Sequence, residues 1–453
     1  MKYVPLSRHF IVPFVTLLLL MTAPQVALSV SGDTFYVDAG DPSSSDSNDG
    51  SESRPWKTIQ KAASTLTAGE TVLVKAGTYT ELYSGYPNTG ITGLKLQNSG
   101  TADAPITFKA YPGDHVVIDQ QHQGTGFYIL QRNHIVIDGF EIKNARSGGV
   151  YTTDSPEGIV VKNNHIHHID GSTGGNVGGV KFDDCGYCTV DGNRIHDIFV
   201  GGTAYNQNVA GVHSFDMHHT TISNNEFSNI YRGVYHKRSS GQKGVTIRNN
   251  TFRNLYNTGV IYSVAGTGDA GHKDQEVYEN IFDNVPTGVK STVWETSTVN
   301  DGLSIYNNVF NTKTAISLAG HQGVEIWNNI FLSSGEQIVT IYHSNGWDNR
   351  IDYSDHNLYD NALSNILERY GNEHTFGSLE AWHDAANTSW VAGSPGANSL
   401  VDSSDCVNPS AGDYQLLDTS VAKGAGRYGD DIGAYPNGGG SIRPQPPTNV
   451  IAQ

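Results

Sequence analysis

The stretch GVTIRNNTFRNL, residues 244–255, contains the repeated pattern from which the fold can be predicted. Apolar and polar residues alternate on both sides of a turn at Asn249 and Asn250, as in two short β-strands joined by a tight corner. Segments between residues 134 and 333 repeat this pattern at steps of 21 to 32 residues. Such self-similarity is typical of a solenoid, in which each unit buries its apolar face only against its neighbours. The aligned turn residues are Gly139, Asn164, Asn193, Asn225, Asn250, Asn280, Asn308 and Asn329.

The repeat contains strand patterns and no helix pattern, so the units stack at the strand spacing of about 4.8 Å. The recurring Asn suits a ladder in which side-chain amides hydrogen-bond from one coil to the next. Asn also tolerates the left-handed backbone of a tight turn. The sequence therefore predicts an all-β fold, a parallel β-helix.

Both ends of the solenoid differ from its middle. Ile59, Ala62, Ala63 and Leu66 recur at helical spacing, which predicts a short amphipathic helix over the first coil. Such a cap covers an open strand edge that would otherwise invite aggregation. Residues 378–386 predict a second helix near the other end.

The first residues are typical of an export signal. A basic start is followed by an apolar run from Phe10 to Met21 and by small residues near Ala27 and Ser29. The run is short for a membrane span, which takes about 20 apolar residues. We expect a secreted or periplasmic monomer with no membrane span after cleavage. The expected parts are a signal peptide (1–29), a cap with the first strand (30–80), the β-helix (81–340), C-terminal coils with a closing segment (341–436), and a Gly/Pro-rich linker (437–453) that a further module could follow.

Charge and cysteine content narrow the class of protein. The net charge is −17, which argues against nucleic acid as a partner, because phosphate binding needs clustered cations. Cys185 and Cys188 form a CGYC motif between strand-like runs, whereas redox motifs of this spacing accompany a βαβ pattern. We expect a local disulfide or two buried thiols there, and no redox catalysis.

A second recurring strand, which begins with Gly-Val, indicates which side chains face outward. The Val positions point inward, and alternation along a strand sends the next residue outward. His236 falls on an inward position, so we expect it to be structural. The first outward column contains Tyr151, Lys181, His213, Tyr235, Ile261, Lys290 and Ser317, and the second contains Thr153, Asp183, Phe215, Lys237, Ser263, Thr292 and Ala319.

The chain from residue 178 to residue 253 has eight Lys or Arg and six Asp or Glu, a local charge of +2 in an acidic molecule. Cations focused in this way suit an anionic ligand. The sequence therefore predicts that these outward side chains are displayed on an open face that binds an anionic polymer.

The Gly-Thr-Tyr of TVLVKAGTYTE and the repeated Asn-Asn turns resemble those of right-handed parallel β-helix proteins in the pectate-lyase-like superfamily. Within it, the chain is similar to secreted polysaccharide lyases that include chondroitinase B, alginate lyases and some pectate lyases. The resemblance spans residues 33 to about 340 and implies a right-handed helix. It also implies cleavage of an acidic, uronic-acid-containing polysaccharide by β-elimination.

β-Elimination needs a group that neutralises the C6 carboxylate, a base for the C5 proton and an acid for the leaving O4. Lys237 is the expected base, because Lys181 and Arg238 would lower its pKa. His213 is the rival base. Tyr235 is the expected proton donor, and Lys181 with Arg238 would hold the carboxylate. The remaining expected substrate contacts are Asp183, Phe215, Tyr151 and Lys290.

Chondroitinase B-like lyases pair a Lys with an Arg and use calcium. Here Ile261 occupies the outward position on the next coil, and an Asn/Glu/Glu calcium set is missing from the sequence pattern. Two alternatives therefore stay open. One is a polygalacturonase-like hydrolase that uses Asp183, Asp184 and Asp216, although that family's Asn-Thr-Asp, Gly-His-Gly and Arg-Ile-Lys elements are absent. The other is a non-catalytic polysaccharide-binding or surface protein.

Two further segments bear on metals. HIHHI (165–169) and HH (218–219) look like ligand clusters, but the pattern assigns both to turns on different coils, so no zinc site is predicted. DSNDGSE (46–52) crowds carboxylates in a way that hard cations favour, without a full calcium-loop spacing. Ca²⁺ is the one cofactor left open.

Overall fold

The structure is a computed structural model. It describes residues 32–82, 93–171, 175–202, 208–238, 241, 244–264, 270–293, 300–332, 339–342, 349–361, 363, 366–369, 374–384 and 391–435. The expected signal peptide (1–29) and linker (437–453) lie outside these residues.

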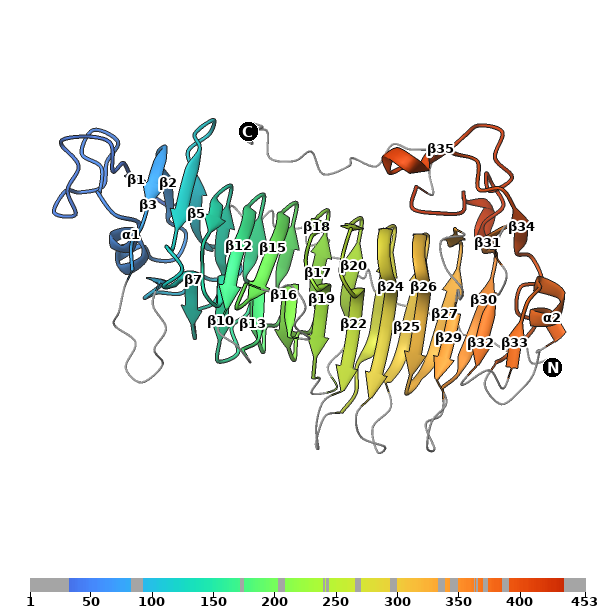
Figure 1. Cartoon of the computed structure of the whole chain (residues 1–453). Coiled ribbons are helices and arrows are strands. Elements are labelled where there is room, and N and C mark those ends of the chain that lie inside the picture. The colour runs from blue at the N-terminus through green and yellow to red at the C-terminus, as the bar shows by residue number, and fades with distance from the viewer. Residues whose placement is uncertain are drawn as a thin grey trace, which may run out of the picture.

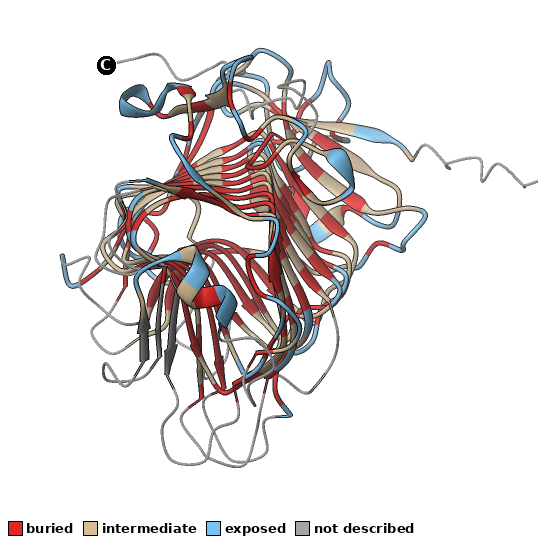
Figure 2. Cartoon of the chain, turned by 90° about the vertical axis from the view of Figure 1, so that its right-hand side faces the viewer, coloured by how far each residue is buried: buried red, intermediate tan, exposed pale blue. Residues whose placement is uncertain are grey.

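The described coils stack along one axis (Figure 1). Each coil contributes strands to three parallel sheets, which we call sheets I, II and III, and the long strands β24 and β26 run through both II and III. In the end-on view of Figure 2 the strands line up behind one another into walls that carry the buried residues. The predicted parallel β-helix with an N-terminal helix is confirmed.

Sheet I contains β1 (Thr34–Val37), β2 (Thr71–Val74), β5 (Ile106–Ala110), β8 (Ile135–Asp138), β11 (Val160–Lys162), β14 (Thr189–Asp191), β17 (Thr220–Ser223), β20 (Val245–Arg248), β23 (Lys273–Tyr278), β25 (Asn300–Tyr306), β27 (His321–Trp327) and β30 (Ile351–Asp355). Sheet II contains β3 (Gly77–Tyr79), β6 (Val116–Asp119), β9 (Glu141–Lys143), β12 (His165–Gly171), β15 (Arg194–Val200), β18 (Glu226–Ser228), β21 (Thr251–Arg253), β24 (Ile281–Val293), β26 (Val309–Ala319), β28 (Ile330–Phe331), β31 (Leu358–Asp360) and β34 (Leu400–Asp402). Sheet III contains β4 (Gly93–Lys95), β7 (Thr125–Leu130), β10 (Gly148–Thr153), β13 (Val177–Asp183), β16 (Val209–Phe215), β19 (Arg232–Lys237), β22 (Thr258–Val264), β24, β26, β29 (Val339–Tyr342) and β32 (Leu367–Arg369), with β33 (His374–Phe376) antiparallel to β32.

The predicted asparagine ladder runs through the corner between sheets I and II. Asn250 is typical: its Oδ1 accepts hydrogen bonds from the backbone N–H and the side-chain amide of Asn225. Its own N–H and amide bond to Asn280 in the next coil. These buried amides satisfy the backbone at each turn, because buried polar groups must find partners. The ladder members are Asn164, Asn193, Asn225, Asn250, Asn280, Asn308, Asn329 and Asn357.

Aromatic rings stack in the core behind sheet II. Phe252 and Phe282 are nearly parallel, with 4.9 Å between ring centroids, and the stack continues on both sides. A column of glycines stands opposite the rings. A Cβ on Gly233 would lie 2.4 Å from a ring carbon of Phe252, so no larger residue fits there without displacing the ring. The stacked rings belong to Phe227, Phe252, Phe282, Phe310, Phe331 and Tyr359.

The cap helix α1 (Ile59–Thr65) lies at the N-terminal end of the solenoid (Figure 1). Thr58 caps it by accepting a hydrogen bond from the N–H of Lys61. The carboxylate of Glu81 accepts from the N–H groups of Ile59 and Gln60, at 2.8 and 2.6 Å. Hydroxyl and carboxylate oxygens at a helix N-terminus satisfy N–H groups that have no partner within the helix.

At the other end, α2 (Leu379–Asp384) follows β33, and the predicted second helix is confirmed. The closing segment contains β35 (Cys406–Asn408), η1 (Pro409–Ala411), β36 (Asp413–Leu416) and η2 (Arg427–Gly429). Cys185 and Cys188 form a disulfide, and Cys406 is buried and free. Within the described residues, no helix is long and apolar enough to cross a membrane.

Candidate functional site

The outer face of sheet III carries the first predicted column in the predicted register. Lys181 pairs with His213, and His213 pairs with Tyr235 on the next coil. Tyr235 pairs with Ile261, which pairs with Lys290. The strand alternation was therefore sufficient to align residues that lie more than 100 positions apart in the chain.

These side chains are covered, so the predicted open display is wrong. Lys181 is 9% exposed, Tyr235 4% and His213 0%. Long neighbours provide part of the cover: the Arg232 guanidinium lies 4.4 Å from the centroid of the Tyr235 ring. The Lys181 ammonium lies 3.8 Å from the centroid of the Tyr151 ring. Cation–π contacts of this kind hold polar side chains flat against the sheet.

Lys237 lies in the second column and is half-buried. Its Nζ donates to Oδ1 of Asn208 at 3.2 Å and to Oδ1 of Asn176 at 3.3 Å. It also lies 5.4 Å from the centroid of the Phe215 ring. Burial, together with the guanidinium of Arg232, lowers the pKa of Lys237. A lowered pKa favours the neutral amine, which is the form that can accept a proton.

The cation that lowers the pKa of Lys237 is Arg232, not Lys181 or Arg238 as expected. Arg238 is exposed just beyond the end of β19, with a left-handed backbone (φ 86°). Arg232 was missed because strict alternation places it inward with Val234. Both Gly233 and Val234 face the core, so the alternation slips by one residue at the corner and Arg232 joins the outer face.

Asp183 lies in a polar group with Tyr151 and Lys181. The Tyr151 hydroxyl donates to Oδ2 of Asp183 at 2.9 Å, and Nζ of Lys181 lies 3.9 Å from the same oxygen. Burial raises the pKa of Asp183 and lowers that of Lys181. Each shift is opposed by the attraction between the two charges. This pair supplies the site with an acceptor and a cation that are fixed in place.

The two histidines of this region differ in their surroundings. His213 is fully buried, and neither of its ring nitrogens has a hydrogen-bond partner among the described residues. Burial and the neighbouring cations Lys181, Lys237 and Arg232 keep its pKa well below the usual range. His236 points inward as predicted, and its Nε2 accepts from the N–H of Met217 at 3.1 Å.

The carboxylates that a hydrolase would need do not form a pair in the strands. Asp184 and Asp216 lie past the ends of β13 and β16, with left-handed backbones (φ 59° and 50°). Asp184 accepts a hydrogen bond from the Ser155 hydroxyl. Of these three carboxylates, only that of Asp183 lies within a strand on the outer face of sheet III. The three carboxylates are therefore divided between strand β13 and the corners that follow β13 and β16.

The metal-like segments also differ from expectation. His165 to Ile169 lie in strand β12, so their assignment to a turn is wrong, whereas His218 and His219 do lie between β16 and β17. In DSNDGSE, the Asp46 carboxylate accepts hydrogen bonds from the N–H groups of Lys57 and Thr58. Asp49 accepts from Ser51. A calcium ion there would compete with these hydrogen bonds for the carboxylates of Asp46 and Asp49.

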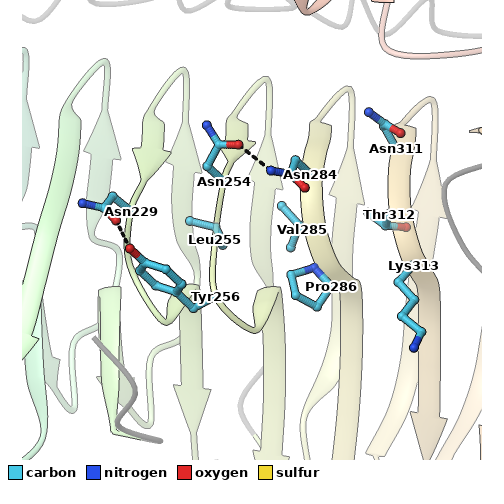
Figure 3. Close-up of a pocket in the computed structure, with 10 residues that line it drawn as sticks. All are labelled: Asn229, Asn254, Leu255, Tyr256, Asn284, Val285, Pro286, Asn311, Thr312 and Lys313. Atoms are coloured by element: carbon cyan, nitrogen blue, oxygen red, sulfur yellow. Dashed lines mark hydrogen bonds between the residues drawn. The ribbon is translucent and has the colours of Figure 1, made fainter. Parts of the chain in front are cut away.

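A groove of about 760 Å³ crosses the corner between sheets II and III, immediately before the chain enters sheet III in each coil. In Figure 3, Tyr256 points toward Asn229, and the amides of Asn254 and Asn284 meet across adjacent coils, with 2.7 Å between Nδ2 and Oδ1. Amides and a phenol ring are side chains that suit sugar hydroxyls and ring faces. The lining residues are Asn229, Asn254, Leu255, Tyr256, Asn284, Val285, Pro286, Asn311, Thr312 and Lys313.

Two family profiles match the chain. Residues 35–185 match the family described as Pel9A-like, right-handed beta helix region. Residues 114–282 match a second family, described as right-handed beta helix region. The two matches together cover the coils that carry the outer face of sheet III up to Lys237.

Two curated proteins are similar in sequence. The chain is 27% identical over 327 residues to the uncharacterized protein YwoF of Bacillus subtilis (strain 168), covering 64% of this chain and 65% of YwoF. It is 38% identical over 78 residues to pectate lyase PEL9 of Emericella nidulans, 17% of each chain. The match spans just under two thirds of YwoF and a small part of PEL9.

Solved structures extend the similarity over most of the chain. Pectate lyase Pel9A matches with a TM-score of 0.54 and 17% identity, over 88% of this chain and 95% of Pel9A. The complex of XylC with xylose matches with a TM-score of 0.50 and 12% identity, over 82% and 86% of the two chains. At these identities the likeness establishes a right-handed parallel β-helix.

Proposed function

We propose that this chain, a right-handed parallel β-helix protein of the pectate-lyase-like superfamily, cleaves an acidic polysaccharide by β-elimination at the outer face of sheet III. The observation that carries the proposal is the half-buried amine of Lys237. It stands beside Arg232 on a face that also contains Lys181 and Tyr235. Buried cations gathered in a chain of net charge −17 favour an anionic ligand.

The proposed reaction assigns one role to each group. Lys181 and Arg232 attract the uronate carboxylate and so make the C5 proton more acidic. The neutral amine of Lys237 removes that proton, and the Tyr235 hydroxyl protonates the leaving O4. A new C4–C5 double bond forms as the C4–O4 bond breaks, and no water is consumed. His213 is the rival base, but its burial and low pKa favour Lys237.

Asp183, Phe215 and Lys290, which are only partly buried, would contact the polymer beside the reacting sugar, and the buried Tyr151 would hold Asp183 in place. Lys290 lies two coils beyond Tyr235 in the same column, and burial with the charge of Arg232 lowers its pKa. The groove at the corner with sheet II offers amides and Tyr256 for uncharged parts of the chain. Export of a monomer from the cell fits this substrate, because acidic polysaccharides are extracellular polymers.

The test is a screen of the purified protein against uronic-acid polymers, followed by ultraviolet absorbance and reducing-end assays. A lyase yields an unsaturated sugar that absorbs in the ultraviolet, together with new reducing ends. A hydrolase that used Asp183, Asp184 and Asp216 would yield reducing ends alone, and a binding protein would yield neither. Either of these last two results on a bound polymer would overturn the proposal.

A further inference from the structure

A group of acidic and imidazole side chains lies on the outer face of sheet II, separate from the face of sheet III described above. It contains Glu141 on β9, His165 and His167 on β12, and His196 on β15, and we call it the histidine cluster. Glu141 pairs with His165 on the next coil, and His167 pairs with His196. Three successive coils therefore contribute to one patch.

The donor atoms of three residues of the histidine cluster converge, and His196 lies beside one of them. Glu141, His165 and His167 each offer a ligand atom, and these three atoms lie within 4.8 Å of one another. Nε2 of His167 lies 3.3 Å from Oε1 of Glu141. Nε2 of His165 lies 2.7 Å from Nε2 of His196. Within the described part of the chain, this is the only set of three such groups that meets so closely.

Imidazole nitrogens and a carboxylate oxygen are the ligands of many zinc sites, with Zn–N distances of about 2.0–2.1 Å. Ligand atoms of a tetrahedral ion at that distance lie about 3.3 Å apart. The contact between His165 and His196, at 2.7 Å, would have to open by roughly 0.6 Å to admit an ion. The rings of His167 and His196 are already parallel, with an interplanar angle of 6°.

The surroundings orient the ligands in the way that metal sites require. Nδ1 of His196 lies 2.7 Å from Oδ2 of Asp197, so a carboxylate fixes that ring and leaves Nε2 toward the cluster. Nε2 of His115 lies 2.6 Å from Oε2 of Glu141. The Asp197 carboxylate holds the His196 ring and raises its basicity, whereas His115 fixes the position of the Glu141 carboxylate.

We propose that Glu141, His165, His167 and His196 bind one divalent transition metal ion, and that the donor set suits Zn²⁺. The site is independent of the proposed lyase function, since it lies on another sheet. The ion would join β9, β12 and β15 and so tie three coils together. Lys143 opposes it, because its Nζ lies 2.9 Å from Oε1 of Glu141 and competes for that oxygen.

The experiment uses the full chain, stripped with a chelator, dialysed against ZnCl₂ and then against metal-free buffer. Elemental analysis is expected to find about one retained Zn²⁺ per chain. The variant His165→Gln/His167→Gln is expected to lose it. The matched control is His218→Gln/His219→Gln. It changes two consecutive histidines outside the histidine cluster, whose Nδ1 atoms lie 3.1 Å apart. The control is expected to keep the ion.

A single substitution outside the ligands tests the site even if the double variant fails to fold. Asp197→Asn leaves every ligand in place and is expected to weaken Zn²⁺ affinity roughly 10–100-fold, measured by calorimetry. Circular dichroism checks that each variant keeps its β-structure. Zinc-free wild type, or equal loss in the His218/His219 control, would overturn the proposal. If the histidine cluster is only a hydrogen-bond network, the wild-type protein will retain no zinc.

Discussion

The imidazole of His213 meets the ring of Tyr235 edge-on in the next coil, with 5.2 Å between ring centroids and 70° between the planes. His213 is fully buried, so the phenol ring packs on one side against a neighbour whose lowered pKa favours its neutral form. Arg232 covers the same phenol from outside. In the proposed reaction these two contacts would hold the Tyr235 hydroxyl in one place, which is what proton transfer in a transition state requires.

Replacing Lys237 by alanine tests the proposed base. We expect kcat to fall by roughly 10²–10⁴, the usual contribution of an acid–base group. Circular dichroism is expected to stay unchanged, because the Lys237 side chain lies on the outer face. Lys162→Ala is the matched control: it removes a partly exposed lysine of sheet I, 3.8 Å from Asp138. Full activity of the Lys237→Ala variant would show that the base does not lie on this face.

Replacing Tyr235 by phenylalanine removes only the hydroxyl and keeps the ring between His213 and Arg232. We expect a loss in kcat of similar size to that of Lys237→Ala, with KM little changed, because the proton is needed only in the transition state. Steady-state kinetics on the polymer found by the screen measures both constants. Tyr128→Phe, in the same column on an earlier coil, is expected to cost much less.

The pH profile reports the amine of Lys237. Since its pKa is lowered, the neutral base becomes available below the usual lysine value of about 10.4, and kcat/KM rises with pH through that lowered pKa. Arg232→Leu removes a nearby positive charge that favours the neutral amine. We expect the rising limb of the profile to move to higher pH in this variant. A limb that did not move, or moved to lower pH, would contradict the assignment.

The asparagine ladder makes a stability prediction. Asn250→Ala leaves the backbone N–H of Asn225 and the C=O of Ile222 without their side-chain partner. Each buried group left unpaired costs about 1–3 kcal/mol. Denaturant unfolding should therefore show a loss of several kcal/mol. Asn254→Gly, which removes an exposed amide bonded to Asn284 and suits the left-handed backbone there (φ 52°), is expected to cost less than about 1 kcal/mol.

The carboxyl of Glu81 makes the N-terminal cap sensitive to pH. Burial raises its pKa in the folded chain from 4.5 to about 7, so between these values the folded chain binds more protons than the unfolded chain. The contribution of Glu81 to stability is therefore full at low pH and falls as the pH rises toward 7. Thermal unfolding of wild type and Glu81→Gln between pH 4.5 and 7 should diverge with this sign. The control Glu70→Gln changes a partly buried carboxylate that accepts from the N–H of Thr67, and it should not abolish the pH dependence assigned to Glu81.

The fold and the register could be predicted because both follow from short-range periodicity. The repeat places Asn at each turn, and alternation then aligns Lys181, His213 and Tyr235 without further information. Burial of that column could not be predicted in the same way. It depends on how far side chains such as Arg232 reach across neighbouring coils, and two successive inward residues at Gly233 and Val234 hid Arg232 from a strict alternation.

The histidine cluster was missed for a related reason. HIHHI follows an Asn-Asn turn, and assigning the whole segment to that turn separated its histidines from Glu141 and His196. In the structure the turn ends at Asn164, and β12 begins at once with His165. The available signal was alternation within the segment itself, where His165 and His167 share a face with a buried Ile166 between them.

The asparagine ladder keeps the same register between neighbouring coils, whatever the length of each coil. Adjacent ladder residues are 32 positions apart between Asn193 and Asn225 but only 21 apart between Asn308 and Asn329, and both steps are closed by the same amide bonds of 2.9–3.1 Å. In the long coil, residues 201–208 intervene between β15 and β16, whereas β26 runs through two sheets without a break. Insertions can thus accumulate beside sheet III without disturbing the frame, so the surface is free to diversify in evolution while the scaffold stays constant.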